Sequence, residues 1–328
     1  MAKARQSLSR LFLNKPTAEE IQHQTTLKAL SEAAEGRPFI LDDEPLRMMY
    51  LTPACMQSVM RIDQPHQLLC AYSRAMMGFL LFNPKPQHIV LIGLGGGSLV
   101  KYCYQHLPDC RITAIEINAD VISMRQQFMI PDDDARFRII HADAVEWLPR
   151  QQCDADVIFL DAYDIHGLVP ALNSAEFYAN CYRQLNQRGV LVANVWGKPS
   201  VLTPMLTLLH QQFSNNVWWI KSADSYNLLV YAVKHTSRDS EPLHAIEKDS
   251  ALHLNHPTLD LQWLADNLQS IQDQRIKSPS ENSENLLQEE LIKRLRNVLV
   301  HDGNVPQSYA EFKSLILNLN AASRFGSP

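Results

Sequence analysis

The sequence feature that most restricts the fold of this chain is residues 89–102, IVLIGLGGGSLVKY. The apolar run at its start predicts a buried strand, and residues 98–105 predict a helix beyond the glycines. Gly93, Gly95 and Gly97 allow a tight turn and a close approach of the backbone to a ligand, while the helix start offers unpaired amide hydrogens. A glycine turn can also do no more than join a strand to a helix, so this segment restricts the fold more than the function.

Strands and helices alternate from His88 onward, which is the pattern of a parallel sheet covered by helices on both faces. Only residues 222–226 separate the last two strands, so at least one of them must run antiparallel. The expected helices include residues 98–105, 120–128 and 174–185, and the expected strands are HIVLI, RITAIEI, FRIIHAD, ADVIFLDAY, GVLVANVW, VWWIK and NLLVYAVK. The sequence therefore predicts a doubly wound α/β fold whose sheet is mostly parallel, with one antiparallel strand.

This central domain is expected to span residues 84–235, between two accessory regions. Residues 1–36 are predicted to be an N-terminal helical extension, because Thr17 and Glu20 have capping-box spacing and Gly36 closes the helix. Residues 37–83 are predicted to be a small β-rich segment followed by a helix over 68–82. Residues 236–328 combine polar linkers with a helical C-terminal extension, whose segments are 259–274, 286–300 and 309–318.

Composition excludes several classes of protein. The 328 residues are 46% hydrophobic and can fill a substantial core, and a net charge of -5 gives no basic field for nucleic acid. No uncharged stretch approaches the roughly 20 residues of a membrane span, and the start lacks the apolar run of a signal peptide. The six cysteines and twelve histidines show no metal-ligand spacing. We therefore expect a cytoplasmic protein with free thiols, no metal, and a small-molecule or protein partner.

Acidic residues stand at the ends of the next two predicted strands after the glycine turn. Glu116 ends the second strand, where a carboxylate can accept both hydroxyls of a ribose. Asp143 ends the third strand, where a carboxylate can accept the exocyclic amine of adenine. Chance rarely places three such features in order at three strand ends. The sequence thus predicts an adenosine-type ligand bound by Gly93, Gly95, Gly96, Gly97, Glu116, Asp143 and Ala144.

The fourth predicted strand ends in Asp161 and Asp164, within DVIFLDAYDIHG. The crevice beyond the carboxyl ends of the strands is the expected ligand position, and two carboxylates there can hold a cationic amine and accept its proton. An ordinary Asp has a pKa of about 3.9, so a base at this position needs partial burial to raise it. Asp164 can alternatively cap the following turn, and Tyr163 can either line the substrate pocket or pack.

Together the GLGGGSL turn, Glu116, the HADA segment at 141–144 and the DAYD segment at 161–164 resemble the spermidine synthase family, over about residues 45–235. The resemblance implies a Rossmann-like class I S-adenosylmethionine-dependent transferase fold preceded by a small β domain. It also implies a proton acceptor at Asp161, a polyamine anchor at Asp164, a ribose ligand at Glu116 and an adenine ligand at Asp143. A homodimer is expected only from this resemblance.

The sequence also departs from that family. Members that make spermidine have an Asp in the glycine turn that pairs with the amino group of the aminopropyl chain, and Gly96 occupies this position here. Their Tyr-His-Glu or Tyr-Gln-Glu triplet is matched only by Tyr72-Ser73-Arg74, and Ile165 replaces a Pro after the second aspartate. Tyr72 and Tyr163 are both predicted to contact the substrate. Without the Asp, the repulsion of the carboxylate of intact S-adenosylmethionine disappears. Arg74 is expected either on the surface or facing the pocket, where it would bind that carboxylate.

The sequence leaves three hypotheses about function. Methyl transfer from S-adenosylmethionine to a nitrogen or carboxylate nucleophile, on an amine or a protein, is narrowly favoured by Gly96 and by the form of the turn, which resembles that of spermidine-synthase-like methyltransferases. The alternative is aminopropyl transfer from decarboxylated S-adenosylmethionine to a diamine such as putrescine, supported by Asp161 and Asp164. A third is a non-catalytic binding or scaffold protein, against which Asp161 argues.

Overall fold

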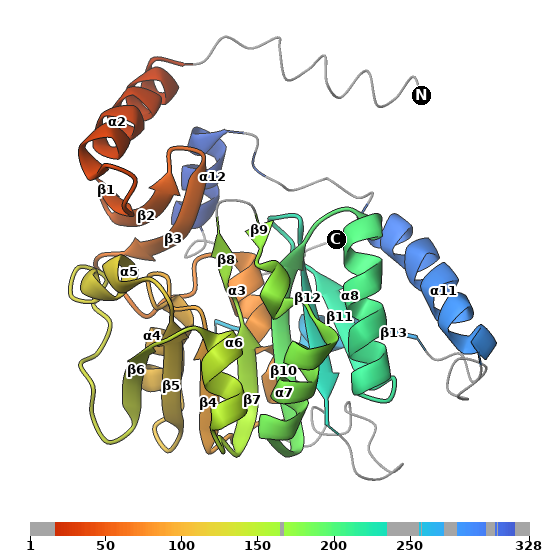
Figure 1. Ribbon diagram of the computed structural model, residues 1–328. Coiled ribbons are helices and arrows are strands. Elements are labelled where there is room, and N and C mark those ends of the chain that lie inside the picture. The colour runs from red at the N-terminus through yellow and green to blue at the C-terminus, as the bar shows by residue number, and fades with distance from the viewer. Residues whose placement is uncertain are drawn as a thin grey trace, which may run out of the picture.

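The computed structural model describes residues 17–164, 167–234, 256, 258–271, 281–299, 306 and 308–318. Its centre is an eight-stranded sheet with the strand order β13-β11-β12-β10-β7-β4-β5-β6 (Figure 1). The strands are β4 (His88–Ile92), β5 (Arg111–Glu116), β6 (Phe137–His141), β7 (Ala155–Leu160), β10 (Leu185–Trp196), β11 (Val217–Lys221), β12 (Asn227–Val233) and β13 (Gln269–Ser270).

The strand directions confirm the predicted fold class. β4 pairs in parallel with both β5 and β7, β5 with β6, and β7 with β10, whereas β12 runs antiparallel to β10 and β11. The sequence did not predict the two-residue strand β13, because residues 259–274 read as one helix. Instead α10 (Leu261–Asn267) ends where Leu268 becomes extended, and β13 pairs with the edge strand β11. Unpaired backbone groups of an edge strand favour such an addition.

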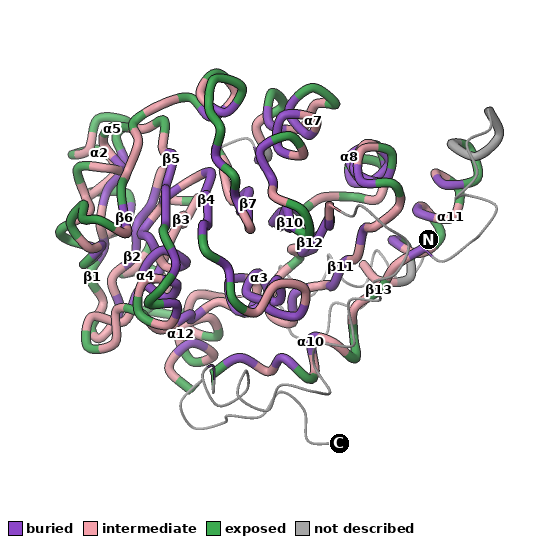
Figure 2. The backbone as a smooth tube through the Cα atoms, turned by 90° about the horizontal axis from the view of Figure 1, so that it is seen from below, coloured by how far each residue is buried: buried purple, intermediate pink, exposed green. Residues whose placement is uncertain are grey.

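Helices cover both faces of this sheet (Figure 2). One face packs against α3 (Ala71–Met76), the 3₁₀ helix η1 (Met77–Leu81), α4 (Ser98–His106) and α10, and its core includes Phe79, Val100 and Leu261. The other face packs against α6 (Ala144–Trp147), α7 (Ala175–Gln184), α8 (Pro199–Gln212) and α11 (Glu281–Leu299). Because both faces are buried, the central strands are mostly apolar, and every residue of β4 is buried.

Two helices are shorter than the sequence predicts. The helix expected over 120–128 is α5 (Ala119–Ser123), and Phe128 is drawn instead into the core beneath the glycine turn. The helix expected over 68–82 begins at Ala71 and tightens into η1 after Met76. Arg74 explains the later start, because its Nη1 donates to the carbonyl oxygens of Leu68 and Leu69 at 2.9 and 2.6 Å.

A small antiparallel sheet lies against the main sheet, as the β-rich segment predicts. It contains β1 (Phe39–Asp43), β2 (Leu46–Thr52) and β3 (Cys55–Arg61). Helices α2 (Ala18–Ala34) and α12 (Tyr309–Asn318) pack side by side on it, one from each end of the chain (Figure 1). Leu27 of α2 and Ile316 of α12 share one buried cluster with this sheet. The capping box of Thr17 and Glu20 forms as predicted.

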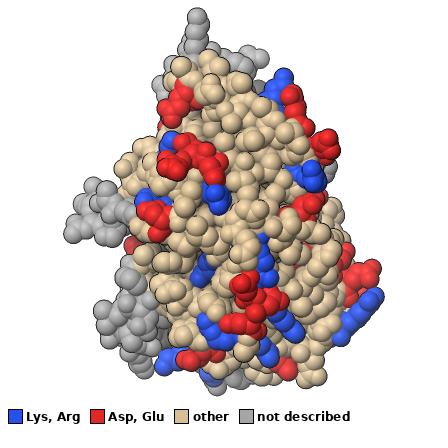
Figure 3. All heavy atoms as spheres, turned by 90° about the vertical axis from the view of Figure 1, so that its left-hand side faces the viewer, with Lys and Arg blue, Asp and Glu red and all other residues tan. Residues whose placement is uncertain are grey.

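One face of the molecule carries charges of both signs (Figure 3). On the side of the molecule that carries α2, α5 and β6, acidic and basic side chains are interspersed (Figure 3). Among the described residues, no helix is long and apolar enough to cross a membrane.

Candidate active site

The glycine turn joins β4 to α4 and needs glycine for steric reasons. A Cβ on Gly93 would lie 2.2 Å from the carbonyl oxygen of Asp161, so the turn passes directly against the end of β7. Gly95 and Gly97 have φ values of 50° and 66°, in the left-handed region that favours glycine. The turn therefore brings its backbone to the carboxyl edge of the sheet, where a ligand can approach closely.

Gly96 owes its identity to packing from the small sheet. A Cβ at this position would lie 2.5 Å from Ser58 Oγ and 2.7 Å from Phe128 Cδ1. Ser58 on β3 and the buried Phe128 ring thus occupy the space that a longer side chain would need. The surroundings therefore suit glycine at this position, because neither aspartate nor alanine fits there without movement of Ser58 and Phe128.

Glu116 fixes the turn in addition to lining the cavity. Its two carboxylate oxygens accept the backbone N–H groups of Leu94 and Asn118, both at 2.9 Å. Each oxygen keeps a further lone pair, so the carboxylate can still accept ribose hydroxyls. Glu116, the residue predicted to bind the ribose, therefore also links the glycine turn to the end of β5. The sequence pattern did not reveal this second role.

Asp143 and Ala144 start α6 at the end of β6. The Asp143 side chain accepts the N–H of Val145 at 2.8 Å and so caps this helix, while the carboxylate stays exposed at the edge of the cavity. Ala144 is buried, and both residues line the cavity. The positions of Asp143 and Ala144 are compatible with the predicted adenine-binding site. Capping of α6 alone also accounts for an aspartate at residue 143.

Asp161 follows β7 and is held by a chain of amides. Asn194 Nδ2 donates to Asp161 Oδ1 at 2.9 Å, and Asn227 Nδ2 donates to Asn194 Oδ1 at 2.7 Å. Burial raises the pKa of the Asp161 carboxyl, and the hydrogen bond from Asn194 opposes that rise. The two asparagines lie on β10 and β12, and the sequence analysis missed them because their partner is distant in sequence.

Tyr163 and Tyr72 flank this aspartate. The Tyr163 hydroxyl donates to the carbonyl oxygen of Asn194, so the ring is anchored while it lines the cavity. Burial and the nearby Asp161 carboxylate both raise the pKa of Tyr72, which lines the same cavity from α3. Both tyrosines therefore stay protonated near neutral pH, and because the Tyr163 proton is donated to Asn194, its hydroxyl oxygen can only accept a further hydrogen bond.

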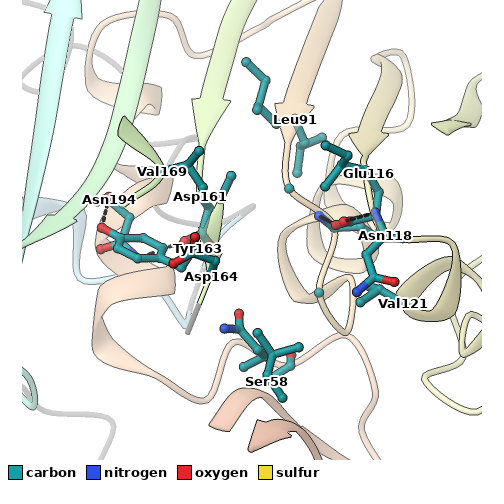
Figure 4. Close-up of a pocket in the computed structure, with 18 of the residues that line it drawn as sticks. Ser58, Leu91, Glu116, Asn118, Val121, Asp161, Tyr163, Asp164, Val169 and Asn194 are labelled. Atoms are coloured by element: carbon teal, nitrogen blue, oxygen red, sulfur yellow. Dashed lines mark hydrogen bonds between the residues drawn. The ribbon is translucent and has the colours of Figure 1, made fainter. Parts of the chain in front are cut away.

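Asp164 lies at the exposed rim, in the two-residue strand β8 (Tyr163–Asp164) that pairs with β9 (Gly167–Leu168). Figure 4 shows Asp161, Tyr163 and Asp164 on one side of the cavity and Glu116 on the other, with Ser58 between them on the small-sheet side. The polyamine-anchoring role of Asp164 remains a prediction. Ile165 and His166 lie outside the described residues.

The placement of Arg74 corrects two sequence expectations. This side chain neither lies on the surface nor faces the cavity, because it is buried and its guanidinium donates to the carbonyl oxygens of Leu68 and Leu69. Ser73 is also buried, with its hydroxyl donating to Cys70 O at 2.8 Å. Arg74 is therefore not a ligand for a substrate carboxylate.

The cavity that these residues enclose has a volume of about 750 Å³ and one sign of charge. Its described lining includes no lysine and no arginine, and it includes the carboxylates Glu116, Asp143, Asp161 and Asp164. Across the described residues no group of three or more His, Cys, Asp or Glu side chains is arranged to hold a metal ion. The six cysteines are free thiols. The acidic lining of the cavity accordingly favours a cationic ligand.

A solved structure shares this architecture. The crystal structure of a probable spermidine synthase from Corynebacterium glutamicum covers 74% of this chain and 94% of its own, with a TM-score of 0.55 and 17% sequence identity. At that identity the likeness concerns the fold. The fold is that of a Rossmann-like class I S-adenosylmethionine-type transferase, with the acidic cavity at the carboxyl edge of its sheet.

Sequence comparisons define the family. The spermine/spermidine synthase domain matches residues 69–225. A polyamine aminopropyltransferase from Chromobacterium violaceum is 34% identical over 198 residues, which cover 60% of this chain and 76% of that protein. Another from Neisseria meningitidis serogroup A is 34% identical over 216 residues, covering 65% and 82%. The chain belongs to the polyamine aminopropyltransferase family and is an enzyme of the S-adenosylmethionine-type transferase class.

These relatives bear on the choice between donors. The sequence analysis narrowly favoured methyl transfer because of Gly96 and the turn, and the comparisons do not support that preference. They favour the alternative, aminopropyl transfer. A missing turn Asp removes one negative charge, but the described lining keeps four carboxylates and includes no lysine or arginine for the carboxylate of intact S-adenosylmethionine.

Proposed function

We propose that the protein transfers the aminopropyl group of decarboxylated S-adenosylmethionine to an amine acceptor. The observation that carries the proposal is the charge of the cavity, whose described lining holds four carboxylates and neither lysine nor arginine. Decarboxylated donor carries a sulfonium and an ammonium, whereas intact donor adds a carboxylate. At 4 Å and an effective dielectric constant of 20, two like charges repel by about 4 kcal/mol, which favours the decarboxylated form.

Asp161 accepts the proton in this reaction. The acceptor nitrogen attacks the aminopropyl carbon next to the sulfonium, a C–N bond forms, and the C–S bond breaks with its electron pair going to sulfur. The products are methylthioadenosine, the extended amine and one proton, which Asp161 takes. The raised pKa of its carboxyl makes it a better base than an exposed Asp, and Asn194 orients it through the hydrogen bond to Oδ1.

Gly96 does not weigh against this proposal. Ser58 and Phe128 fill the space beside it, so a turn Asp would fit in this chain only if these side chains moved. The negative field on the donor ammonium comes instead from Asp161 and Asp164, which face Glu116 across the cavity (Figure 4). Methyl transfer would require a partner for the donor carboxylate, and Arg74 is turned away from the cavity.

A donor comparison tests the proposal. The purified protein is mixed with a panel of amines and with either decarboxylated or intact S-adenosylmethionine, and the nucleoside products are separated by chromatography. We expect methylthioadenosine from the decarboxylated donor. Formation of S-adenosylhomocysteine from the intact donor, without turnover of the decarboxylated one, would refute the proposal.

A further inference from the structure

A second cavity adjoins the first one on the side away from the nucleotide positions. It has a volume of about 760 Å³, and Met56, Tyr72, Ser225 and Asn227 line both cavities. Its other walls come from α2, from α12 and from the loop between β11 and β12. We call this cavity the terminal-helix chamber, because the two terminal helices provide most of the residues that the first cavity lacks.

The terminal-helix chamber is negatively charged. Among the described residues that line it there are two carboxylates, Glu20 and Asp224, and no lysine or arginine. His23 also lines it, but burial lowers the pKa of this imidazole, which is therefore neutral at pH 7. Arg74 interacts electrostatically with Asp224 but donates to backbone carbonyl oxygens and lines neither cavity.

Asp224 keeps binding capacity in spite of its structural contacts. Its Oδ2 accepts the N–H of Ala71 at 2.7 Å and its Oδ1 accepts the Ser222 hydroxyl at 2.9 Å. Each oxygen therefore has a lone pair left for an ammonium group. These contacts also fix the carboxylate at the start of α3, so that it is positioned before any ligand arrives.

Polar groups connect this chamber with the base. Asn227, which lines both cavities, donates to Asn194, which donates to Asp161. Tyr72 lies within electrostatic reach of both Asp161 and Asp224, as the rise of its pKa by both carboxylates indicates. Ser225 also lines both cavities, and its buried hydroxyl has no hydrogen-bond partner. A chain of amines that begins at Asp161 can thus continue past Tyr72 to Asp224.

The volumes of the two cavities favour a long acceptor. The first cavity, at about 750 Å³, already has the volume of a complete small-molecule site and can hold a nucleoside donor with a short diamine beside it. A second cavity of similar volume is more than a four-carbon diamine requires. An acidic extension of this kind suits a longer linear cation.

We propose that the preferred acceptor is a linear polyamine with at least three amino groups, whose far ammonium group binds Asp224 in the terminal-helix chamber. This proposal rests on the proposed aminopropyl transfer and adds the class of acceptor. The near amino group of the acceptor lies at Asp161, and the chain passes between Tyr72 and Asn227.

The test compares acceptors of two lengths with decarboxylated S-adenosylmethionine as donor. We expect kcat/KM for the triamine spermidine to exceed that for the diamine putrescine by about tenfold or more, because the second ammonium gains a charge-assisted hydrogen bond. Asp224→Asn keeps the shape of the side chain and its acceptor oxygen for Ala71, and it should remove this advantage. Glu19→Gln is the matched control, since Glu19 is exposed on α2 and lines neither cavity.

A steric variant keeps the proposal testable if Asp224→Asn misfolds. Leu315→Trp fills the chamber from α12 and should lower the triamine-to-diamine ratio of kcat/KM, whereas Leu286→Trp on the exposed side of α11 should leave the ratio unchanged. A wild-type ratio near or below one, or a ratio that both cavity variants leave intact, overturns the acceptor proposal while aminopropyl transfer to putrescine still stands. Absence of transfer to every amine overturns both proposals.

Discussion

The two sides of the active site are built in different ways. On the nucleotide side, the glycine turn, Glu116 and Asp143 follow three successive strands, and each side chain is placed by the strand immediately before it. On the acceptor side, α2, β3, the start of α3, β12 and α12 meet from both ends of the chain. Local sequence therefore sets the donor site, and tertiary packing sets the acceptor site.

The largest effect is expected at the point where the two sides meet. Asp161→Asn removes the proton acceptor and should lower kcat by about 10²- to 10⁴-fold, with donor affinity nearly unchanged. Single-turnover kinetics measures the first quantity and calorimetric titration with decarboxylated S-adenosylmethionine the second. Retained turnover would remove the proposed role of Asp161.

A change on the nucleotide side should act on donor binding alone. Glu116→Gln replaces one acceptor oxygen by an amide donor that faces the N–H of Leu94 or Asn118. We expect donor affinity to fall by about 10- to 100-fold, because a hydrogen bond to a charged group is lost and the turn loosens. Calorimetry with methylthioadenosine checks this change. An unchanged affinity would contradict the ribose assignment.

The amide chain behind Asp161 should control the pH dependence. The hydrogen bond from Asn194 lowers the pKa of the Asp161 carboxyl against the rise caused by burial, so Asn194→Ala should raise that pKa further. A base must be ionised, and kcat/KM therefore falls as the pH drops through this pKa. The fall should move to higher pH by about one unit, with about tenfold lower kcat/KM at pH values below this pKa. A pH–rate profile identical to that of the wild type would exclude Asp161 as the titrating base.

The smallest effect is expected from the terminal helices. Thr17→Ala removes the capping box of α2 and should cost about 1 kcal/mol of helix stability. Because α2 borders only the acceptor side, kcat/KM for spermidine should fall a few-fold while donor affinity stays constant. Thr25→Ala, at an exposed position of the same helix, is the control. An equal loss of donor affinity and of kcat/KM for spermidine would show that the nucleotide side and the acceptor side are not separable.

The same contrast explains how much the sequence could reveal. The strand–turn–helix unit, Glu116, Asp143 and Asp161 follow strand ends in chain order, so pattern and spacing were sufficient to predict their positions, while their roles stay predictions. Asn194 and Asn227 look like ordinary strand residues until β10 and β12 bring them to Asp161. Arg74 was misjudged because its partners are backbone carbonyl groups, which carry no signature in the sequence.

The pairing of α2 with α12 on the small sheet has an evolutionary consequence. Neither helix contributes to the main sheet, and both lie outside the segment that matches the synthase domain, residues 69–225. If the acceptor binds in the terminal-helix chamber as proposed, mutations in these helices change which amine is selected and leave in place the residues proposed to act on the carbon–sulfur bond. New acceptor specificity can then arise through changes in these two helices alone, while the donor site stays as it is.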